Sequence, residues 1–513
     1  MRCASTVLAV HRALRSSMAS EDVDPALCVV LPVYKAMPYL AVAVRDVLKQ
    51  DLQGQRLELV CSWDGAADED WDWLVSLAAA LGGERASVDE VAAPATPAAP
   101  AAPAALQAGD APAAAWAPGA PAWAPAANPA NDAAPRANED EDHPLFKSDE
   151  PAAPAAEALS PSEAAKSCRP EHLLRVVRYA DKANRGQGAA MSLALKRSQA
   201  PFVAQMESDD SRPRSDGLFL MLDALRKHED WDGVACDAVC FGTHVSQRMA
   251  AYVDWQNSLT QPQHLSRERF VEIPALHQTA LFRRAAVDAT LAPTRGAYRD
   301  GRDLCAADAA DHAAQLDTPV DLWWWLEFFD RGLRCGRVSS PLSTAAAAPS
   351  TNADAPSDAA ATTDARHASD SPVALDGRFF GWRQHARQRT RQHGRLSLEN
   401  LRKVKVHFLL RGDVKYGNAV VVSVGKTLDG YADELRAHPH APESVHTVEW
   451  RPSKRIYPPF PPVPAALLRR NMAAAAGDDK PLLRLFAYGD ARARARVKLH
   501  VPDWDDALDI FCA

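Results

Sequence analysis

Residues 201–213 read PFVAQMESDDSRP, an apolar run that ends in three carboxylic acids, Glu207, Asp209 and Asp210. A buried strand that leads into clustered carboxylates is one way to hold a hard divalent cation, because such cations take oxygen ligands and the strand fixes their positions. Acid clusters in loops are also commonly solvated surface, and Asp210 or Ser211 could instead cap a helix ahead of Pro213. The stretch therefore predicts a strand, and the role of its acids depends on what surrounds them.

The segments before this stretch repeat one pattern, in which a short apolar run is followed by a loop and a helical pattern. Such runs occupy residues 26–31, 57–61, 173–177 and 202–206. Successive strand-loop-helix units predict a parallel α/β sheet. Ligands of such sheets bind beyond the carboxyl ends of the strands. At those ends lie Pro32, Val33, Tyr34, Asp64 and the acid cluster.

Composition sets bounds on the domains. The chain has 513 residues, of which 47% are hydrophobic, so it is long and apolar enough for sizeable cores and about three domains. Three segments, about 86–166, 293–317 and 343–374, are rich in alanine and proline and poor in branched and aromatic residues. Such segments bury too little apolar surface to offset chain entropy, so they are predicted to be disordered insertions.

Charge and cysteine content narrow the class of protein. The net charge of −8 argues against nucleic acid or an anionic membrane as the main ligand, although residues 383–395 form a local basic patch. No run of eighteen apolar residues predicts a membrane span. The nine cysteines lack zinc-type spacing, which favours a reduced, soluble, cytoplasmic chain. Residues 1–25 are expected to form a flexible tail, and their acid-free opening is also compatible with organellar targeting.

Six stretches carry a resemblance to a known family. VVLPVYKAMPYL (29–40), LELVCSWDGAAD (57–68) and RGQGAAMSLALKRSQAPFVAQMESDD (185–210) resemble the family 2 glycosyltransferases, which have the GT-A fold. YVDWQNSLTQPQHL (252–265), DLWWWLEFFDRGLRCGRV (321–338) and FFGWRQH (379–385) are similar to a narrower branch, the β-1,3-N-acetylglucosaminyltransferase-like proteins. The resemblance implies a Rossmann-like, mostly parallel α/β catalytic domain over about 26–400. Residues 404–513 are expected to form a small C-terminal Rossmann-like unit.

The same resemblance implies an activity. It is that of an inverting transferase that moves a sugar, expected to be N-acetylglucosamine, from a UDP-sugar donor to an acceptor hydroxyl. In the family, a DxD-like motif binds the donor diphosphate through a divalent metal, here Mn²⁺ or Mg²⁺. Carried over position by position, the resemblance implies three sets of site residues: for the donor Pro32, Val33, Tyr34, Asp64, Arg185, Asp209 and Arg383; for the metal Asp209, Glu207 and His385; and for the general base Asp321.

The chain departs from the family pattern at three positions. Trp63 and Val320 stand where the family has acids, and Glu207 replaces an aspartate. These departures leave open a second hypothesis, a catalytically silent module that binds a nucleotide-sugar. The acceptor is not identified, because acceptor loops diverge freely on a fixed scaffold, and residues 252–279 are the segment expected to touch it.

Several of these residues also have a plain structural interpretation. Asp64 could only start a turn with Gly65, Arg185 could be a solvated loop arginine, and Asp321 could cap a helix. His385 could belong to a basic, solvated helix start. Most of the three adjacent tryptophans at 323–325 are expected to pack in the core, because neighbouring positions on a helix point in different directions.

The C-terminal segment 418–435 has the strand, glycine and helix order of a Rossmann-like opening. Its Gly425-Lys426-Thr427 is not a phosphate-binding P-loop, because Val420 stands where the upstream glycine is required. A nicotinamide-linked oxidoreductase would need G-x-G-x-x-G here, and that motif is missing after Val424. No chemistry is assigned to this unit.

Overall fold

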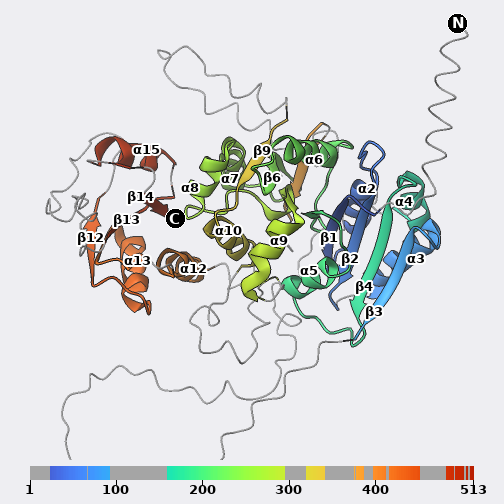
Figure 1. Ribbon diagram of the computed structural model, residues 1–513, viewed down its shortest axis with the longest axis horizontal. Helices are drawn as coiled ribbons and strands as arrows, with labels where there is room; N and C mark the ends of the chain where they lie inside the picture. Colours follow the sequence, from blue (N-terminus) through green and yellow to red (C-terminus); the bar gives the residue numbers. More distant parts are fainter. Residues whose placement is uncertain are drawn as a thin grey trace, which may run out of the picture.

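The computed structural model describes residues 24–65, 68–92, 159–294, 298, 319–340, 375, 377–385, 397–411, 415–450, 481–489, 491–501, 504–505 and 509–512. Within these residues an eight-stranded sheet forms the first unit and a four-stranded sheet the C-terminal unit (Figure 1). The predicted α/β class with a mostly parallel sheet and a small C-terminal α/β unit is confirmed. Nearly all of the predicted N-terminal tail and the central parts of the predicted insertions lie outside the described residues.

The large sheet has the strand order β3-β4-β2-β1-β5-β8-β6-β9. Its strands are β1 (Leu27–Val33), β2 (Leu57–Trp63), β3 (Ala86–Val91), β4 (Leu173–Tyr179), β5 (Phe202–Gln205), β6 (Gly233–Cys236), β8 (Ala280–Arg283) and β9 (Cys335–Val338). Strand β8 runs antiparallel to both of its neighbours, β5 and β6, and the other pairings are parallel. Strands β1 and β2 are buried along their whole length, which explains why β1 is a continuous apolar run and why β2 is apolar except at Glu58 and Ser62.

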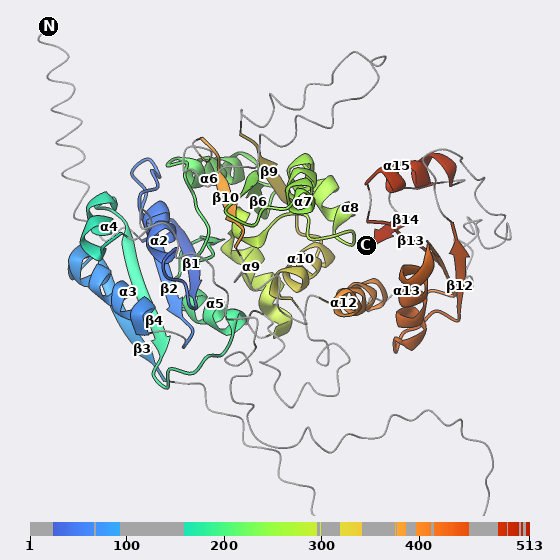
Figure 2. The same cartoon turned by 180° about the vertical axis from the view of Figure 1, so that it is seen from behind.

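Helices cover both faces of this sheet (Figure 2). The crossovers are α2 (Leu40–Leu48), α3 (Asp68–Leu81), α4 (Pro161–Ser167), α5 (Gln187–Leu195) and α6 (Gly217–Lys227), and the helices that follow are α7 (Gln247–Ser258), α8 (Pro262–Glu268), α9 (Arg284–Leu291) and α10 (Val320–Asp330). The connections β1-α2-β2 and β4-α5-β5 run in opposite directions along the sheet. Because such crossovers are right-handed, α2 and α5 lie on opposite faces.

This change of direction creates a switch point between β1 and β5. Strand β1 has β2 on one side and β5 on the other, and the register pairs Val30 with Gln205. The carboxyl ends of β1 and β5 therefore lie next to each other, with the connections leaving them toward opposite edges of the sheet. In open α/β sheets this is where a crevice for a ligand forms. The acid cluster begins at this point.

The prediction of a disordered insertion over about 86–166 was wrong at both ends of that segment. Strand β3 and all of helix α4 but its last residue lie inside the segment 86–166 that composition assigned to a disordered insertion. Strand β3 is an edge strand whose residues alternate between half-buried and exposed, with Val88 42% exposed, so its sequence carries little apolar signal. It is ordered by pairing with β4 rather than by its own composition. Strand β5, predicted as the fourth strand, is consequently the fifth along the chain.

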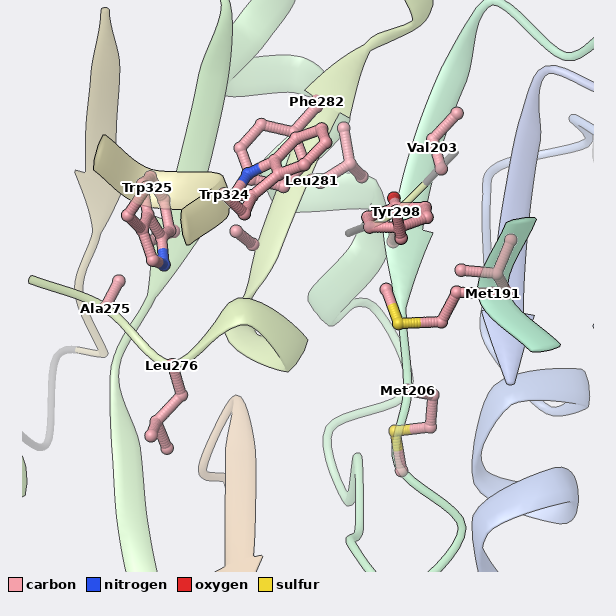
Figure 3. Close-up of a cluster of buried hydrophobic side chains, with 14 of the residues drawn as sticks. Met191, Val203, Met206, Ala275, Leu276, Leu281, Phe282, Tyr298, Trp324 and Trp325 are labelled. Atoms are coloured by element: carbon pink, nitrogen blue, oxygen red, sulfur yellow. The ribbon is translucent and has the colours of Figure 1, made fainter. Parts of the chain in front are cut away.

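Aromatic side chains fill the core between β8 and α10 (Figure 3). Trp324 stacks on Tyr298 with ring centroids 5.3 Å apart and meets Phe282 edge-on at 5.3 Å. Trp325 lies 5.6 Å from Phe282, and Trp323 packs on the far side against Phe408 at 4.7 Å. All three tryptophans are buried, so the expectation that most of them pack in the core is confirmed.

His277 is enclosed by this cluster and carries a pH-sensitive contribution to stability. Its ring stacks on Trp324 at 5.0 Å, and its buried Nε2 has no hydrogen-bond partner among the residues that the structure describes. Burial lowers the pKa of His277 from 6.5 to about 3, because removal from water disfavours the charged form of the imidazole. The imidazole is therefore neutral in the folded chain at neutral pH.

We expect the His277→Phe variant to lose part of the acid sensitivity of the wild type. Between pH 6.5 and about 3 the unfolded chain takes up a proton at His277 that the folded chain does not, so stability falls as pH decreases. The slope is about 1.4 kcal/mol per pH unit for one such group. Urea unfolding at pH 6.5 and pH 5 measures it. Equal losses in the wild type and the variant would show that His277 is not buried in its neutral form.

The C-terminal unit is a parallel sheet of order β12-β11-β13-β14. Its elements are α12 (Leu398–Leu410), β11 (Asn418–Ser423), α13 (Gly425–Ala437), β12 (Ser444–Glu449), β13 (Leu482–Ala487), α15 (Ala491–His500) and β14 (Asp509–Cys512). Helix α12 spans the predicted boundary near residue 404 and joins the two units. Arg411, at its end, pairs with Glu327 and Asp330 of α10 at 2.6 Å each.

Two further observations concern the described residues as a whole. No helix among them is long and apolar enough to cross a membrane. The cysteines within the described ranges are all buried and free of disulfides: Cys28, Cys61, Cys168, Cys236, Cys240, Cys335 and Cys512.

Candidate nucleotide-sugar and metal site

The acid loop leaves β5 at the switch point. The backbone N–H of Met206 donates to the carbonyl of Val30 at 3.0 Å, which extends the pairing with β1 by one residue before the acids. Three residues later, the Asp209 side chain reaches outward and is 26% exposed. Its Oδ2 lies 2.8 Å from Nε2 of His385. The structure thus brings together two of the three residues predicted as metal ligands.

A distant segment supplies His385. Strand β10 (Phe380–Arg383) pairs with β7 (Ala238–Phe241), and the segment after it continues this contact because the Gln384 N–H donates to the Phe241 carbonyl at 2.7 Å. On its other side, Gly381 exchanges two backbone hydrogen bonds with Ser211, at 2.9 and 3.1 Å. The segment 380–385 is therefore fixed between β7 and the acid loop, and the predicted WRQH motif is delivered to the acids by backbone pairing.

Hydrogen bonds and aromatic rings hold Arg383 beside Asp209. Its Nε donates to the Asp209 carbonyl at 2.8 Å, and its backbone N–H donates to Oδ1 of Asp210 at 2.9 Å. The guanidinium lies over two rings, 4.3 Å from the centroid of Tyr39 and 4.4 Å from that of Phe241. A guanidinium in this position is fixed in orientation, and such a group suits an anionic ligand such as a phosphate.

Asp210 supports the loop from inside. Its side chain is buried, and it accepts hydrogen bonds from Arg383 N–H and from Nε2 of Gln278 at 3.3 Å. Burial, together with the neighbouring carboxylate of Asp209, raises the pKa of Asp210 well above its usual value. Asp210 therefore positions Arg383 rather than facing outward like Asp209.

Glu207, the third predicted ligand, contacts two amide side chains. Its Oε1 accepts hydrogen bonds from Nε2 of Gln187 at 2.7 Å and from Nε2 of Gln205 at 2.5 Å. Gln187 begins helix α5, so Glu207 joins the end of β5 to the start of the preceding helix. The role of Glu207 as a metal ligand stays a prediction, and it would require at least part of this amide contact to rearrange.

Helix α2 holds the chain immediately after the acids. The buried carboxylate of Asp46 accepts hydrogen bonds from the Ser211 hydroxyl and from the Arg212 N–H through its Oδ2. Its Oδ1 accepts from Arg45 at 3.0 Å and from Lys49 at 2.7 Å, so the negative charge is balanced. Asp46 thereby fixes where the acid loop ends.

We expect Asp46→Ala to destabilise the chain by about 2 to 3 kcal/mol, because it leaves the Ser211 hydroxyl and the Arg212 N–H buried without an acceptor. The acid loop should also lose its fixed position, so binding of UDP should weaken. Urea unfolding and calorimetry measure the two effects. Asp223→Ala, on the exposed side of α6, is the matched control, and a loss no larger than that control would contradict this role of Asp46.

Asp64 lies at the same edge of the sheet and holds a neighbouring loop. It directly follows β2, its N–H donates to the Val33 carbonyl at 2.9 Å, and its Oδ1 accepts from the Arg185 N–H at 2.7 Å. Gly65 has φ +72°, and a Cβ there would lie 2.6 Å from the backbone of Lys182 and Asn184. Asp64 thus both forms a turn with Gly65 and orders the loop before α5.

The Arg185 side chain contacts residues close to it in the sequence. Its Nη2 donates to Oδ2 of Asp181 at 2.6 Å, and the guanidinium lies 4.9 Å from the ring centroid of Tyr179. Contact of Arg185 with a donor stays a prediction. Of the remaining predicted donor residues, Pro32 and Val33 are backbone-paired in β1, whereas Tyr34 is 38% exposed just beyond it.

Trp63, one of the departures from the family pattern, is explained by packing. Its side chain is buried and lies 6.1 Å from the ring of Trp71, and Arg178 sits 3.9 Å above Trp71. The residue at this position therefore contributes to the core between β2 and α3. Base recognition at this edge would rest on Asp64 and on the loop after β1.

Asp321 belongs to a separate group with Tyr252 and Glu272. It is the second residue of α10, whose N-cap is Pro319, so the interpretation of Asp321 as an N-cap is wrong. Its Oδ1 accepts from the N–H of Leu322 at 2.9 Å. Burial raises the pKa of Asp321 to about 6, the Leu322 hydrogen bond opposes that rise, and the nearby Glu272 carboxylate adds to it. A carboxylate with a pKa near 6 is suited to accept a proton near neutral pH.

Aromatic side chains border this group. Tyr252 stacks on Trp255 at 5.9 Å and meets Trp382 edge-on at 6.4 Å. Trp382 immediately precedes Arg383, so the aromatic cluster connects the Asp321 group with the acid loop through strand β10. Tyr252 and Trp255 are half-buried, whereas Trp382 is buried.

The side chains at the acid loop suit a metal ion only if a bound substrate supplies its remaining ligands. Among the described residues, no cluster of three or more His, Cys, Asp or Glu is placed to bind a metal ion alone. Asp209 and His385 offer two ligands that already face each other. Mg²⁺ and similar cations are commonly held by one or two protein groups together with substrate phosphates, and the pair fits that arrangement.

Sequence reasoning missed the residues that support the site. The Tyr39 ring packs against the Arg383 guanidinium and lies 5.3 Å from the His385 ring. Gln278 donates to Asp210, and Asp46 accepts from the backbone just after the acids. None of them belongs to a local motif, and each acts through the fold. Tyr39 alone had a signal, since it follows the loop after β1 in the quoted stretch VVLPVYKAMPYL.

Comparison with known proteins gives similarities to solved structures. No protein-family model and no curated protein matches the chain. Residues 1–349 of S. aureus TarS share 12% identity with it, over 75% of this chain and 66% of that one, with a TM-score of 0.37. The same TarS fragment in complex with UDP-GlcNAc shares 11%, over 80% and 71%, with a TM-score of 0.38.

A second solved protein is the mannosyltransferase PcManGT from Pyrobaculum calidifontis in complex with GDP-Man and Mn²⁺. It shares 11% identity over 64% of this chain and 61% of its own, with a TM-score of 0.31. The chain thus spans less than two thirds of PcManGT and of the unliganded TarS fragment. One neighbour is thus a mannosyltransferase solved with GDP-Man, and the other was solved with UDP-GlcNAc.

Proposed function

We propose that the chain is a metal-dependent glycosyltransferase that moves a sugar from a nucleoside-diphosphate sugar to an acceptor hydroxyl. The observation that carries the proposal is the Asp209–His385 pair, fixed beside Arg383 at the switch point of a mostly parallel sheet. A diphosphate needs positive charge on more than one side. Arg383 supplies one such charge, and a cation held by the pair would supply another.

The donor would lie across the carboxyl ends of β1, β2 and β5. Asp64 and the loop after β1 would meet the base, with Tyr34 the exposed side chain there. Asp209 and His385 would hold Mn²⁺ or Mg²⁺, and Glu207 would join them if its amide contacts rearrange. When bound, the cation neutralises charge that develops on the leaving diphosphate. Arg383 would hold the diphosphate in one orientation through its fixed guanidinium.

Asp321 would take the proton from the acceptor hydroxyl as that oxygen attacks the anomeric carbon from the face opposite the leaving group. This in-line attack inverts the configuration of the anomeric carbon. The pKa of Asp321, raised to about 6, leaves it ionised yet basic enough at neutral pH. The aromatic surface formed by Tyr252, Trp255 and Trp382 would position the acceptor. UDP-N-acetylglucosamine is the proposed donor, on the strength of the sequence resemblance.

A second candidate is a nucleotide-sugar binding protein without catalysis. Two observations favour it: Glu207 is engaged by glutamines, and Val320 stands where the family pattern has an acid. Such a protein would use Asp64, Asp209 and Arg383 in the same way. It would lack only the transfer step.

One experiment distinguishes the two candidate functions. The full chain is incubated with Mn²⁺ and a panel of UDP- and GDP-sugars, and release of the nucleoside diphosphate is followed, with calorimetry on the same samples. A transferase hydrolyses at least one donor slowly even without its acceptor. A silent module binds with metal and releases no product, and absence of both binding and hydrolysis contradicts both candidates.

A further inference from the structure

A cleft lies between the two units, away from the acid loop. It has a volume of about 410 Å³ and is formed by three segments: α8 with the residues after it, the end of α10 with the turn that follows, and β14 of the C-terminal unit. None of its lining residues belongs to the acid loop, to the segment 380–385 or to the Asp321 group. A ligand here would contact both units at once.

Three arginines line this cleft, and two of them are balanced by acids. Arg334 pairs with Asp230 at 2.6 Å, and Arg267 lies 3.4 Å from the Glu268 carboxylate. Asp509 also borders the cleft, but its carboxylate is fully buried and paired with Arg484. It therefore adds little negative charge to the cleft.

Within the described part of the chain, Arg269 is the arginine of this cleft that has no direct ion pair. Among the described residues it hydrogen-bonds only to Ser266, its Nη1 donating to the carbonyl at 2.6 Å, and it stacks on Phe270 at 4.6 Å. Asp330, the acid near it, is paired with Arg411 at 2.6 Å. Burial lowers the pKa of Arg269, as expected for a guanidinium removed from water without a close counter-ion. An anion in the cleft would supply that counter-ion.

The rest of the lining is apolar. Phe270, Phe329, Leu333 and Ile510 face the same space as the arginines. The volume lies within the usual range of small-molecule sites, which extends from about 300 to 1,000 Å³. A bare inorganic anion would leave these apolar walls uncovered, whereas an organic anion would cover them. Guanidinium groups favour phosphate because two N–H donors match two phosphate oxygens.

We propose that this cleft binds a small organic phosphomonoester, with the phosphate on Arg269 and the organic part against Phe270, Phe329 and Leu333. Arg267 and Arg334, each paired with an acid, border the same cleft. Because β14 forms one wall, the ligand bridges the C-terminal unit and the large sheet and acts as an effector rather than as a donor. This assignment gives the C-terminal unit a role that does not depend on the proposed transferase activity.

The test is calorimetry on the full chain with UMP, glucose 1-phosphate and inorganic phosphate, in EDTA so that no divalent metal is present. We expect at least one of the two phosphomonoesters to bind, and inorganic phosphate to bind at least tenfold more weakly because it makes no apolar contact. Arg269→Gln should weaken binding at least tenfold. Arg436→Gln removes the same charge from the exposed face of α13 and should leave binding unchanged.

Two further variants keep the result interpretable. Leu333→Trp fills the cleft without removing a charge, so it should abolish binding even if Arg269→Gln proves unstable. Asp209→Ala should leave binding in EDTA unchanged, which separates this cleft from the proposed donor site. Absence of binding up to about 10 mM by both phosphomonoesters would overturn the proposal, as would unchanged affinity in Leu333→Trp.

Discussion

Asp209→Asn is expected to lower turnover of the donor by about 10²- to 10³-fold, or roughly 3 to 4 kcal/mol in transition-state stabilisation. Asparagine keeps the size of the side chain, but it removes the charge that would hold the metal opposite His385. Donor hydrolysis at saturating Mn²⁺ measures the effect. Because Asp209 is partly exposed and its carboxylate does not support the core, the unfolding midpoint should change little.

The matched control is Asp433→Asn, which removes an exposed carboxylate from α13. His385→Ala should reduce turnover less than Asp209→Asn and should raise the Mn²⁺ concentration needed for half-maximal rate, since the cation would keep one of its two protein ligands. Full activity in Asp209→Asn, with the control also active, would contradict the assignment of the acid loop.

Asp321→Asn is expected to lower kcat by 10²- to 10⁴-fold, because a positioned general base contributes that much. Donor binding should be unchanged, since Asp321 lies in a different group from the acid loop.

The pH profile of the wild-type transfer rate gives a second test of Asp321 as the base. Because the pKa of Asp321 is raised to about 6 and the base must be ionised, the transfer rate should fall about tenfold per pH unit below pH 6.

Glu272→Gln offers a separate control for this residue. The Glu272 carboxylate contributes to the raised pKa of Asp321, so its removal should shift the acidic limb of the profile to lower pH while activity is retained. A purely structural role for Asp321 would leave that limb unmoved. An Asp321→Asn variant with wild-type transfer rate would exclude Asp321 as the base.

Much of the first sheet could be predicted from the sequence because its strands are buried on both faces. Strands β1, β2 and β5 are apolar runs without alternation, and each ends at polar residues. Strand β3 was not predicted, because it is an edge strand whose residues alternate in exposure. Pairing with β4 holds this strand in place, and local composition does not predict that pairing.

The candidate site could be predicted in part. Asp209 was found because it follows a buried strand, and His385 because it lies in a motif that resembles the family. The contact between Asp209 and His385 depends on pairing of β10 with β7 and with Ser211, and no local pattern encodes it. The supporting roles of Tyr39 and Asp46 could not be predicted either, because each acts across elements that are distant in the sequence.

The central claim is that Asp209 and His385 hold a divalent cation together with a diphosphate. Electron paramagnetic resonance of Mn²⁺ tests it directly, since the signal of free Mn²⁺ diminishes when the ion binds. The account predicts weak Mn²⁺ binding to the full chain alone, tight binding when UDP is added, and loss of the UDP effect in Asp209→Asn. Equal Mn²⁺ binding with and without UDP, or an undiminished UDP effect in Asp209→Asn, would contradict it.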